Sequence, residues 1–134
     1  MMNTFQPGDL FCEKFAVTKE VYDAFQKCSG DYNPLHTDEN FARMRGFSQR
    51  VMYGNILNAF LSCFIGEKLP TKDVIIQSQE ISYKNPVYLN EMLDFEAVVA
   101  GIYEAVHTIE FKFKFIKPDG IIAAKGKILI GLLR

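Results

Sequence analysis

Hydrophobic and polar positions alternate along the second half of the chain. The clearest case is the segment HTIEFKFKFIK, in which apolar and charged residues alternate. Its apolar positions are Ile109, Phe111, Phe113 and Phe115. A period of two places these side chains on one face of a β-strand and the charged side chains on the other. The segment is therefore predicted to be a strand with one buried face.

Four further strands are expected. The segment MLDFEAVVA also carries its apolar residues on one face, VIIQSQEISYK leads up to Pro86, and IIAAKGKILIGLL follows a PDG turn at 118–120. A short strand near 10–15 brings the total to about five. Strands of this kind are typical of a twisted antiparallel sheet.

The first half of the chain shows helical spacing instead. Val21, Tyr22, Phe25 and Cys28 fall on one face of a helix that Thr18 can cap at its beginning. This spacing predicts a helix from Thr18 to about Cys28.

Two more helices are predicted. Asp38 can cap a short helix that ends near Gly46. Between 52 and 65 apolar residues occur on nearly every side, which indicates a helix surrounded by protein. Gly66 and Pro70 are the signals for its end.

These elements define an α+β fold. One apolar face of the sheet needs a cover, and the helix predicted at 52–65 is the candidate. The chain has few other helices with which to hide the rest of the sheet edge, so a homodimer is expected.

Composition narrows the class of protein. The chain has 134 residues, which suits a single domain spanning 1–134, and its formal net charge is −1 with no basic run, so we expect no nucleic-acid partner. Apolar stretches are too short to span a membrane, and the N-terminus does not have the pattern of a signal peptide. Cys12, Cys28 and Cys63 match no zinc spacing and are interpreted as reduced thiols of a cytoplasmic protein.

Candidate chemistry concentrates in the segment SGDYNPLH at 29–36. Gly30, Asp31, Asn33 and Pro34 are turn formers, and a residue before proline is biased away from the helical region, so a loop is predicted. This loop would carry a carboxylate and, five residues later, an imidazole at His36.

SGDYNPLH resembles the hydratase motif of the MaoC-like, (R)-specific enoyl-CoA hydratase family, Ser/Thr-Gly-Asp-x-Asn-Pro-Leu/Ile/Val-His. Every fixed position of that motif is present. The segments RVMYGNILNAFLSCFIGEKLP and ISYKNPVYLNEMLDFEAVV are similar to the family's central helix and to the strand–turn–strand unit that follows. The resemblance implies a hot-dog fold, in which an antiparallel sheet wraps around a long helix, in an edge-to-edge dimer.

Two departures from the family pattern are visible. Tyr53-Gly54-Asn55 stands where the family commonly has His-Gly-Met, and Asn90-Glu91 replaces Gly-Asp in a turn. The glycine is kept, and Asn tolerates the left-handed backbone that a turn can need. Neither change removes a group on which the expected chemistry depends.

The resemblance implies that Asp31, His36 and Gly54 are catalytic. Hydration of an α,β-unsaturated thioester needs a base for water, an acid for the α-carbon and a donor for the enolate oxygen. Asp31 is assigned as base, and His36 as the group that holds the water and protonates the α-carbon, although the sequence leaves open which group moves which proton. The Gly54 N–H, just before the central helix, is the oxygen donor, and Asn33 is interpreted as a brace behind the pair.

The substrate tail needs an apolar pocket. The family resemblance places that pocket at Ser62, Ile65 and Ile130, although Ile65 and Ile130 are equally compatible with a plain core role. Arg43, Arg45 and Arg50 are candidates for contacts with coenzyme A phosphates. No metal or organic cofactor is required, because the thioester itself acidifies the α-carbon.

Three functions follow from the resemblance. The first is reversible (R)-specific hydration of trans-2-enoyl-CoA to (R)-3-hydroxyacyl-CoA. The second is dehydration of 3-hydroxyacyl thioesters on an acyl carrier protein (ACP), which predicts a basic patch at the mouth of the site. The third is a non-catalytic module that binds acyl thioesters. A metal site at Asp31 and His36 is a distant fourth, because a third ligand at suitable spacing is missing.

Overall fold

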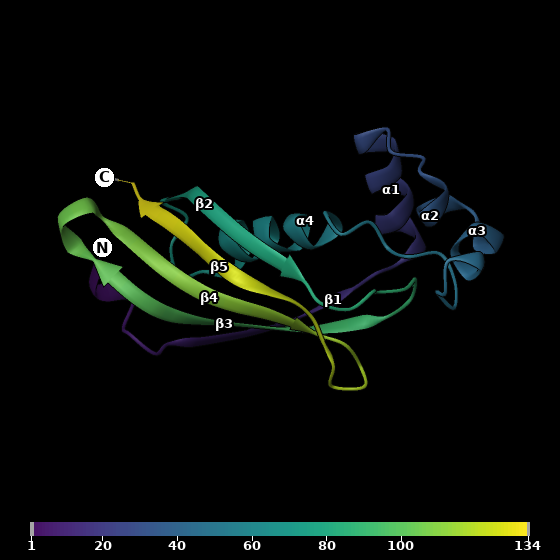
Figure 1. The fold of residues 1–134 in the computed structure, drawn as a ribbon. Helices are drawn as coiled ribbons and strands as arrows, with labels where there is room; N and C mark the ends of the chain where they lie inside the picture. The colour runs from purple at the N-terminus through teal and green to yellow at the C-terminus, as the bar shows by residue number, and fades with distance from the viewer. Residues whose placement is uncertain (1, 134) are drawn as a thin grey trace.

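Five antiparallel strands form one sheet in the computed structural model, which describes residues 2–133 (Figure 1). They are β1 (Leu10–Ala16), β2 (Val74–Tyr83), β3 (Met92–Tyr103), β4 (Thr108–Ile116) and β5 (Ile122–Leu132). Their order in the sheet is β1-β3-β4-β5-β2, so β1 and β2 are the two edges. The predicted five-stranded antiparallel sheet is confirmed.

The alternating pattern of β4 sets which face of the sheet is buried. All four predicted apolar positions of this strand are buried, and the partner strand β3 buries its own apolar face beside them. Phe111 pairs with Val99, and Phe115 pairs with Phe95. A slip of one residue in this register would turn the apolar face of one of the two strands toward solvent, so burial fixes the pairing.

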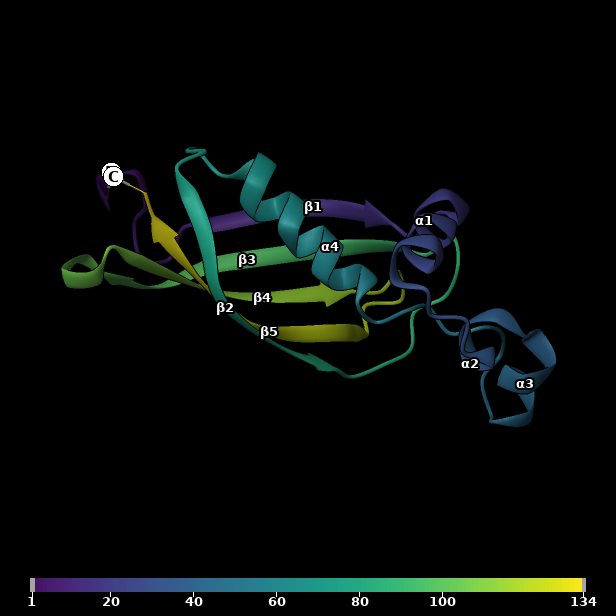
Figure 2. The same cartoon turned by 90° about the horizontal axis from the view of Figure 1, so that it is seen from above.

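Helix α4 (Ile56–Cys63) lies across the buried face of the sheet, as Figure 2 shows, and continues as a wider π-helical turn, η2 (Phe64–Lys68). The prediction of a helix from 52 was wrong at its start. The Met52 N–H donates to the Val87 carbonyl at 2.8 Å, which holds the approach to the helix in a non-helical form. Ser62 and Ala59 are exposed, so α4 is not covered on every side.

The remaining helices gather beyond one end of the sheet in both views (Figures 1 and 2). They are α1 (Lys19–Ser29), α2 (Pro34–Thr37) and α3 (Glu39–Met44), and two short 3₁₀ turns, η1 (Met2–Thr4) and η3 (Glu104–Val106), lie elsewhere. Thr18 and Asp38 cap α1 and α3 as predicted, each accepting a backbone N–H with its side chain. Among residues 2–133 no helix has the length and apolar character needed to cross a membrane.

Lys117 is a buried cation. It lies just after β4, two residues beyond Phe115 and with the parity of the buried face, and it is 9% exposed. Its ammonium donates to the Pro86 carbonyl at 2.5 Å and lies 3.4 Å from the Glu91 carboxylate. Lys117 therefore fixes the loop between β2 and β3.

Replacing Lys117 with methionine is expected to lower the free energy of unfolding by about 2 to 3 kcal/mol, because it removes the ion pair of Glu91 and leaves the Pro86 carbonyl without its donor. The matched control is Lys114→Met, which breaks a solvent-exposed pair with Glu96 and is expected to cost less than about 1 kcal/mol. Urea denaturation measures both values. Equal losses for the two variants would contradict the structural role of Lys117.

Candidate active site

Residues 30–33 of the motif form the predicted loop, whereas Pro34–Thr37 form a capped helical turn, α2. Asn33 is the N-cap of α2, and its side-chain oxygen accepts the Leu35 N–H at 2.9 Å. Pro34 takes the first helical position, where its missing N–H costs nothing. The Asp31 Oδ1 accepts the Asn33 N–H at 3.0 Å. Two successive side-chain caps therefore set the position of His36 relative to Asp31.

The His36 imidazole is held on one side and free on the other. Its Nδ1 lies 2.6 Å from the Val51 carbonyl oxygen, to which it donates its proton. In the neutral ring this leaves Nε2 as an acceptor. The Tyr22 hydroxyl donates to the carbonyl of His36 itself, which fixes the backbone below the ring. Burial raises the pKa of Tyr22 to about 12, so this hydroxyl keeps its proton at neutral pH.

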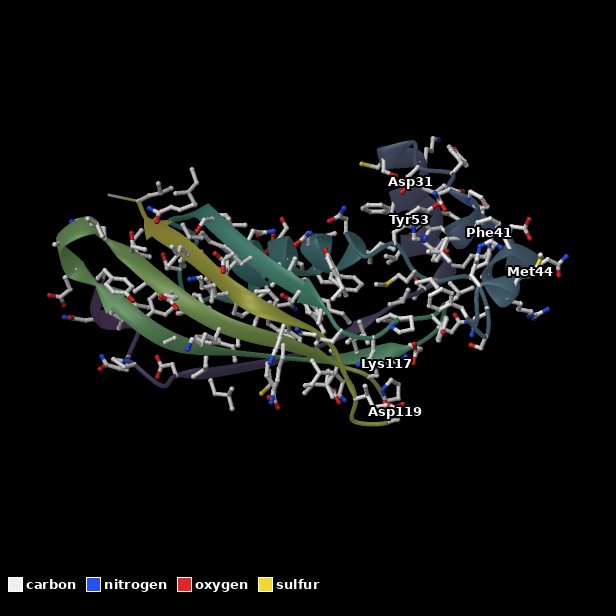
Figure 3. The ribbon with its side chains drawn as sticks, viewed as in Figure 1. Asp31, Phe41, Met44, Tyr53, Lys117 and Asp119 are labelled. Carbon is white, nitrogen blue, oxygen red and sulfur yellow. The ribbon has the colours of Figure 1, made fainter. Side chains whose placement is uncertain are left out.

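Tyr53 contacts both halves of the motif. Its ring stacks on His36 with centroids 4.2 Å apart, and its hydroxyl donates to the Asp31 carbonyl at 2.6 Å. The ring also packs against Tyr22 and Phe25 at 5.1 Å each. Burial raises the pKa of Tyr53, which keeps the hydroxyl a donor. Figure 3 shows Tyr53 beside Asp31 at the end of the molecule formed by α1 to α3.

Gly54 lies two residues before α4. No residue within 2–133 accepts a hydrogen bond from its N–H, so this donor is available to a ligand near the start of the helix. A Cβ at this position would lie 3.0 Å from the Tyr83 ring, so a larger residue would require that ring to shift.

Two cavities meet at these residues. The smaller, of about 180 Å³, is lined by Asp31, His36 and Gly54 together with Tyr53, Asn55 and Tyr83. The larger, of about 360 Å³, shares His36, Gly54 and Tyr83 with it. Its other walls are mainly apolar and are formed by Phe47, Met52, Leu57 and Val87, with Lys84 and Asn85 also in the lining. The three residues predicted to be catalytic thus line one cavity.

The predicted acyl-pocket residues lie elsewhere. Ile65 and Ile130 are buried in the core, and Ser62 is exposed on α4. None of the three lines either of the two cavities at His36. Their role in substrate binding stays a prediction.

The arginines near the site are engaged by their own neighbours. Arg43 and Arg50 both lie near the Glu39 carboxylate, at 3.5 and 3.4 Å, and Arg45 lies over the Phe41 ring. Lys84 has no ion pair with any described residue and lines the larger cavity.

Sequence reasoning did not identify Tyr53, Tyr83 or Lys84 as parts of the site. In the sequence, Tyr53 stands out only as a departure from the family pattern. The alternation of β2 places Tyr83 on the same face as Ile81, which is a weak signal for a residue that reaches Gly54.

Comparison with known proteins assigns the family. The model of the MaoC like domain family matches residues 10–117, and the chain belongs to this family. The predicted resemblance is therefore confirmed, and the sheet and helix arrangement is that of the hot-dog fold of its structural neighbours.

Individual relatives support the family assignment, and their names are those of hydratases and dehydratases. The chain is 29% identical over 109 residues to an (R)-specific enoyl-CoA hydratase from Aeromonas caviae, covering 81% of each chain. It is 28% identical over 109 residues to a mitochondrial 3-hydroxyacyl-[acyl-carrier-protein] dehydratase from Arabidopsis thaliana, covering 81% of this chain and 61% of the relative. The solved structure of the (R)-hydratase from A. caviae, involved in PHA biosynthesis, superposes with a TM-score of 0.88 at 26% identity, covering 96% of this chain and 97% of that one.

Proposed function

We propose that this protein is a hydro-lyase that adds water to trans-2-enoyl-CoA and forms (R)-3-hydroxyacyl-CoA, a reaction that also runs in reverse. The observation that carries the proposal is the meeting of Asp31, His36 and the free Gly54 N–H around one cavity. A positioned acid–base pair and an oxyanion donor are the parts that the reaction needs. The (R) configuration comes from the names of the relatives.

The mechanism uses the Asp31 carboxylate, the His36 imidazole and the Gly54 N–H. Hydrogen bonds hold the first two, and the start of α4 positions the third. The substrate carbonyl accepts the Gly54 N–H, and the water lies against the Asp31 carboxylate and His36 Nε2. The water oxygen bonds to C3, one water proton passes to the Asp31–His36 pair, and the pair returns a proton to C2. The negative charge that develops on the thioester oxygen is stabilised by the Gly54 N–H and the start of α4. One water is added, and the protein ends in its starting state.

Product configuration tests the proposal beyond simple turnover. The protein is incubated with crotonyl-CoA, and the 3-hydroxybutyrate released by hydrolysis is separated on a chiral column. The (R) product is expected. The (S) product, or a racemate, would contradict the assignment.

We further propose that the carrier arm of the substrate lies in the larger cavity. Lys84 supplies a cation and Asn85 an amide there, which suit the phosphates and amides of coenzyme A. The same residues could receive the arm of an acyl carrier protein, which shares the phosphopantetheine chemistry.

Replacing Lys84 with alanine is expected to raise KM for crotonyl-CoA by about tenfold, the effect of losing roughly 1.4 kcal/mol of charge-assisted contact. KM for crotonyl-N-acetylcysteamine, which has no phosphate, is expected to stay within about twofold. Steady-state kinetics with both substrates measure the difference. Equal changes for the two thioesters would show that Lys84 does not contact the phosphates.

A homodimer is proposed through the β2 edge, in the cytoplasm. This ten-residue edge strand has no pairing partner on its outer side among the described residues, and it exposes Ile75 (55%) and Ile76 (38%). A long open edge with apolar side chains is a template for pairing with another chain. The three cysteines are free, as suits a reducing compartment.

Sedimentation equilibrium tests the dimer. The wild type is expected at twice the mass of one chain, and Ile75→Lys is expected to shift it to the mass of one chain, because a charge would be buried in the paired edge. The matched control is Ile121→Lys, which changes an exposed isoleucine far from β2 in the chain and is expected to remain dimeric. A monomeric wild type would overturn the proposal.

A further inference from the structure

The Tyr22 hydroxyl lies between two backbone carbonyls of the candidate active site. It donates to the carbonyl of His36, and it lies 3.2 Å from the carbonyl oxygen of Val51. The two carbonyls belong to segments 15 residues apart in the chain, and Tyr22 itself belongs to α1. Tyr22 is 3% exposed. One buried tyrosine therefore joins three segments of the chain at the histidine of the motif.

The Val51 carbonyl determines the state of the His36 ring. It lies 2.6 Å from His36 Nδ1, and because a carbonyl oxygen can only accept, Nδ1 carries the proton of the neutral ring. The other nitrogen, Nε2, is then the acceptor that can take a proton from a water in the cavity that His36 lines. In the other tautomer the two nitrogens have the opposite roles. The position of one carbonyl thus decides whether His36 offers an acceptor to the cavity.

Val51 lies in an irregular segment between α3 and α4, so no helix or strand holds its carbonyl. The N–H groups of Val51 and Met52 donate to other backbone carbonyls at 3.1 and 2.8 Å, but neither bond involves the Val51 oxygen. Among residues 2–133 that oxygen accepts from the His36 ring and from the Tyr22 hydroxyl. Tyr22 is therefore the group that ties the Val51 oxygen to the backbone of the motif.

The hydroxyl also screens the two carbonyls from each other. Two carbonyl oxygens that face one point repel each other, and the O–H dipole of Tyr22 places a positive hydrogen between them. The tyrosine side chain is itself held on two sides, by the Tyr53 ring at 5.1 Å and by the Arg50 guanidinium at 5.4 Å. A phenylalanine would keep this packing and lose only the hydroxyl.

We propose that Tyr22 is a positioning residue that selects the tautomer of His36 by holding the Val51 carbonyl against Nδ1. Without the hydroxyl the two carbonyls move apart, and Nδ1 loses its fixed acceptor. The ring then populates both neutral tautomers, and in one of them Nε2 is a donor that cannot take a proton from water. The consequence for turnover rests on the proposed hydration reaction, whereas the tautomer is a property of the free protein.

The tautomer is measured by long-range proton–nitrogen NMR correlation on the free protein, at a pH at which the imidazole is neutral. The chain has two histidines, so His107 serves as an internal reference in each spectrum. The wild type is expected to show His36 with a protonated Nδ1 and an unprotonated Nε2. In Tyr22→Phe the His36 signals are expected to shift toward the average of the two tautomers.

Two results of this measurement would overturn the inference. One is a folded Tyr22→Phe protein with the wild-type His36 signals. The other is a wild type that already shows the average of the two tautomers, and this test holds even if Tyr22→Phe does not fold.

Steady-state kinetics with crotonyl-CoA connect the tautomer to turnover. Tyr22→Phe is expected to lower kcat by about 10- to 100-fold, because a misplaced catalytic group reduces turnover, and to leave KM within about twofold. A wild-type kcat in a variant whose tautomer has shifted would show that Tyr22 does not position His36 for the reaction. A shifted tautomer in a protein that hydrates no enoyl thioester would overturn the proposed reaction and support the contact of Tyr22 with His36.

Thr108→Val is the matched control. Thr108 is 7% exposed, and its hydroxyl also contacts two acceptors, the Val106 carbonyl and Gln77 Oε1, each at 3.1 Å. It begins β4, at the end of the sheet opposite α1 to α3 (Figure 1). The variant removes a comparable buried hydroxyl and is expected to leave the His36 tautomer and kcat at the wild-type values. A tautomer shift as large as that of Tyr22→Phe would overturn the specific role of Tyr22.

Discussion

Replacing Asp31 with asparagine, or His36 with alanine, is expected to lower kcat by about 10²- to 10⁴-fold, the range that a positioned acid or base contributes. Asp31 is exposed and makes its side-chain hydrogen bond to a neighbouring backbone group, so the asparagine variant is expected to stay folded. His36→Ala loses its hydrogen bond to Val51 and its stacking on Tyr53, which together correspond to about 2 kcal/mol of stability. Steady-state assays with crotonyl-CoA measure the change in kcat. Thermal unfolding followed by circular dichroism measures the change in stability.

Matched controls are available within the chain. Asp119→Asn changes an exposed aspartate in the turn after Lys117, away from Asp31 in Figure 3, and is expected to leave turnover at the wild-type value. His107→Asn changes the only other histidine and suits its left-handed backbone, at φ 51°. Wild-type turnover in either Asp31→Asn or His36→Ala would show that the catalytic assignment is wrong.

The second large effect is expected at Tyr53. Truncation to alanine removes a buried ring that packs against His36, Tyr22 and Phe25, and such aromatic truncations cost about 3 to 5 kcal/mol of unfolding free energy. Tyr53→Phe keeps the ring and removes only the hydrogen bond to the Asp31 carbonyl. It is expected to remain folded while kcat falls about tenfold, because small misplacements of a catalytic group reduce turnover.

The comparison of these two variants separates packing from positioning. Tyr103→Phe is the control, since it removes an exposed hydroxyl that bonds Glu110 far from the motif. Denaturant unfolding and steady-state kinetics are measured on all three variants. A Tyr53→Phe protein with wild-type kcat would show that the hydroxyl does not position Asp31 for catalysis.

The sheet could be predicted from the sequence because burial on one face imposes a period of two. Phe111 and Phe115 alternate with Lys112 and Lys114, and no other element makes that pattern favourable. Strand order was not accessible in the same way. The pairing of β2 with β5 depends on contacts between residues that are far apart in the chain, such as Ile81 with Gly126.

The motif segment shows why local propensity gave the wrong backbone for part of the site. Gly30, Asn33 and Pro34 are turn formers, which predicted a loop. The same residue types also begin helices: Asn33 caps α2 and Pro34 occupies its first position. The residue types alone do not distinguish a loop from the start of a helix. In the structure, the Leu35 N–H donates to the Asn33 side chain, and this bond caps α2.

The parts of the site that were missed depend on tertiary contacts. Tyr53 lies 22 residues after Asp31 and reaches it only because the segment that follows α1 lies beside the residues leading into α4. Outside the site, Lys117 has the position of a buried strand residue, and its ammonium contacts Pro86 and Glu91 of the β2–β3 loop. Neither contact leaves a periodic signal in the sequence.

The most direct test of the central claim is the hydration of crotonyl-CoA by the wild-type protein and by Asp31→Asn, followed as loss of the ultraviolet absorbance of the enoyl thioester. The wild type is expected to remove the enoyl-thioester absorbance. The folded Asp31→Asn protein is expected to do so at a rate at least about 100-fold lower. A folded wild type that leaves both crotonyl-CoA and its pantetheine thioester unchanged would contradict the proposed reaction.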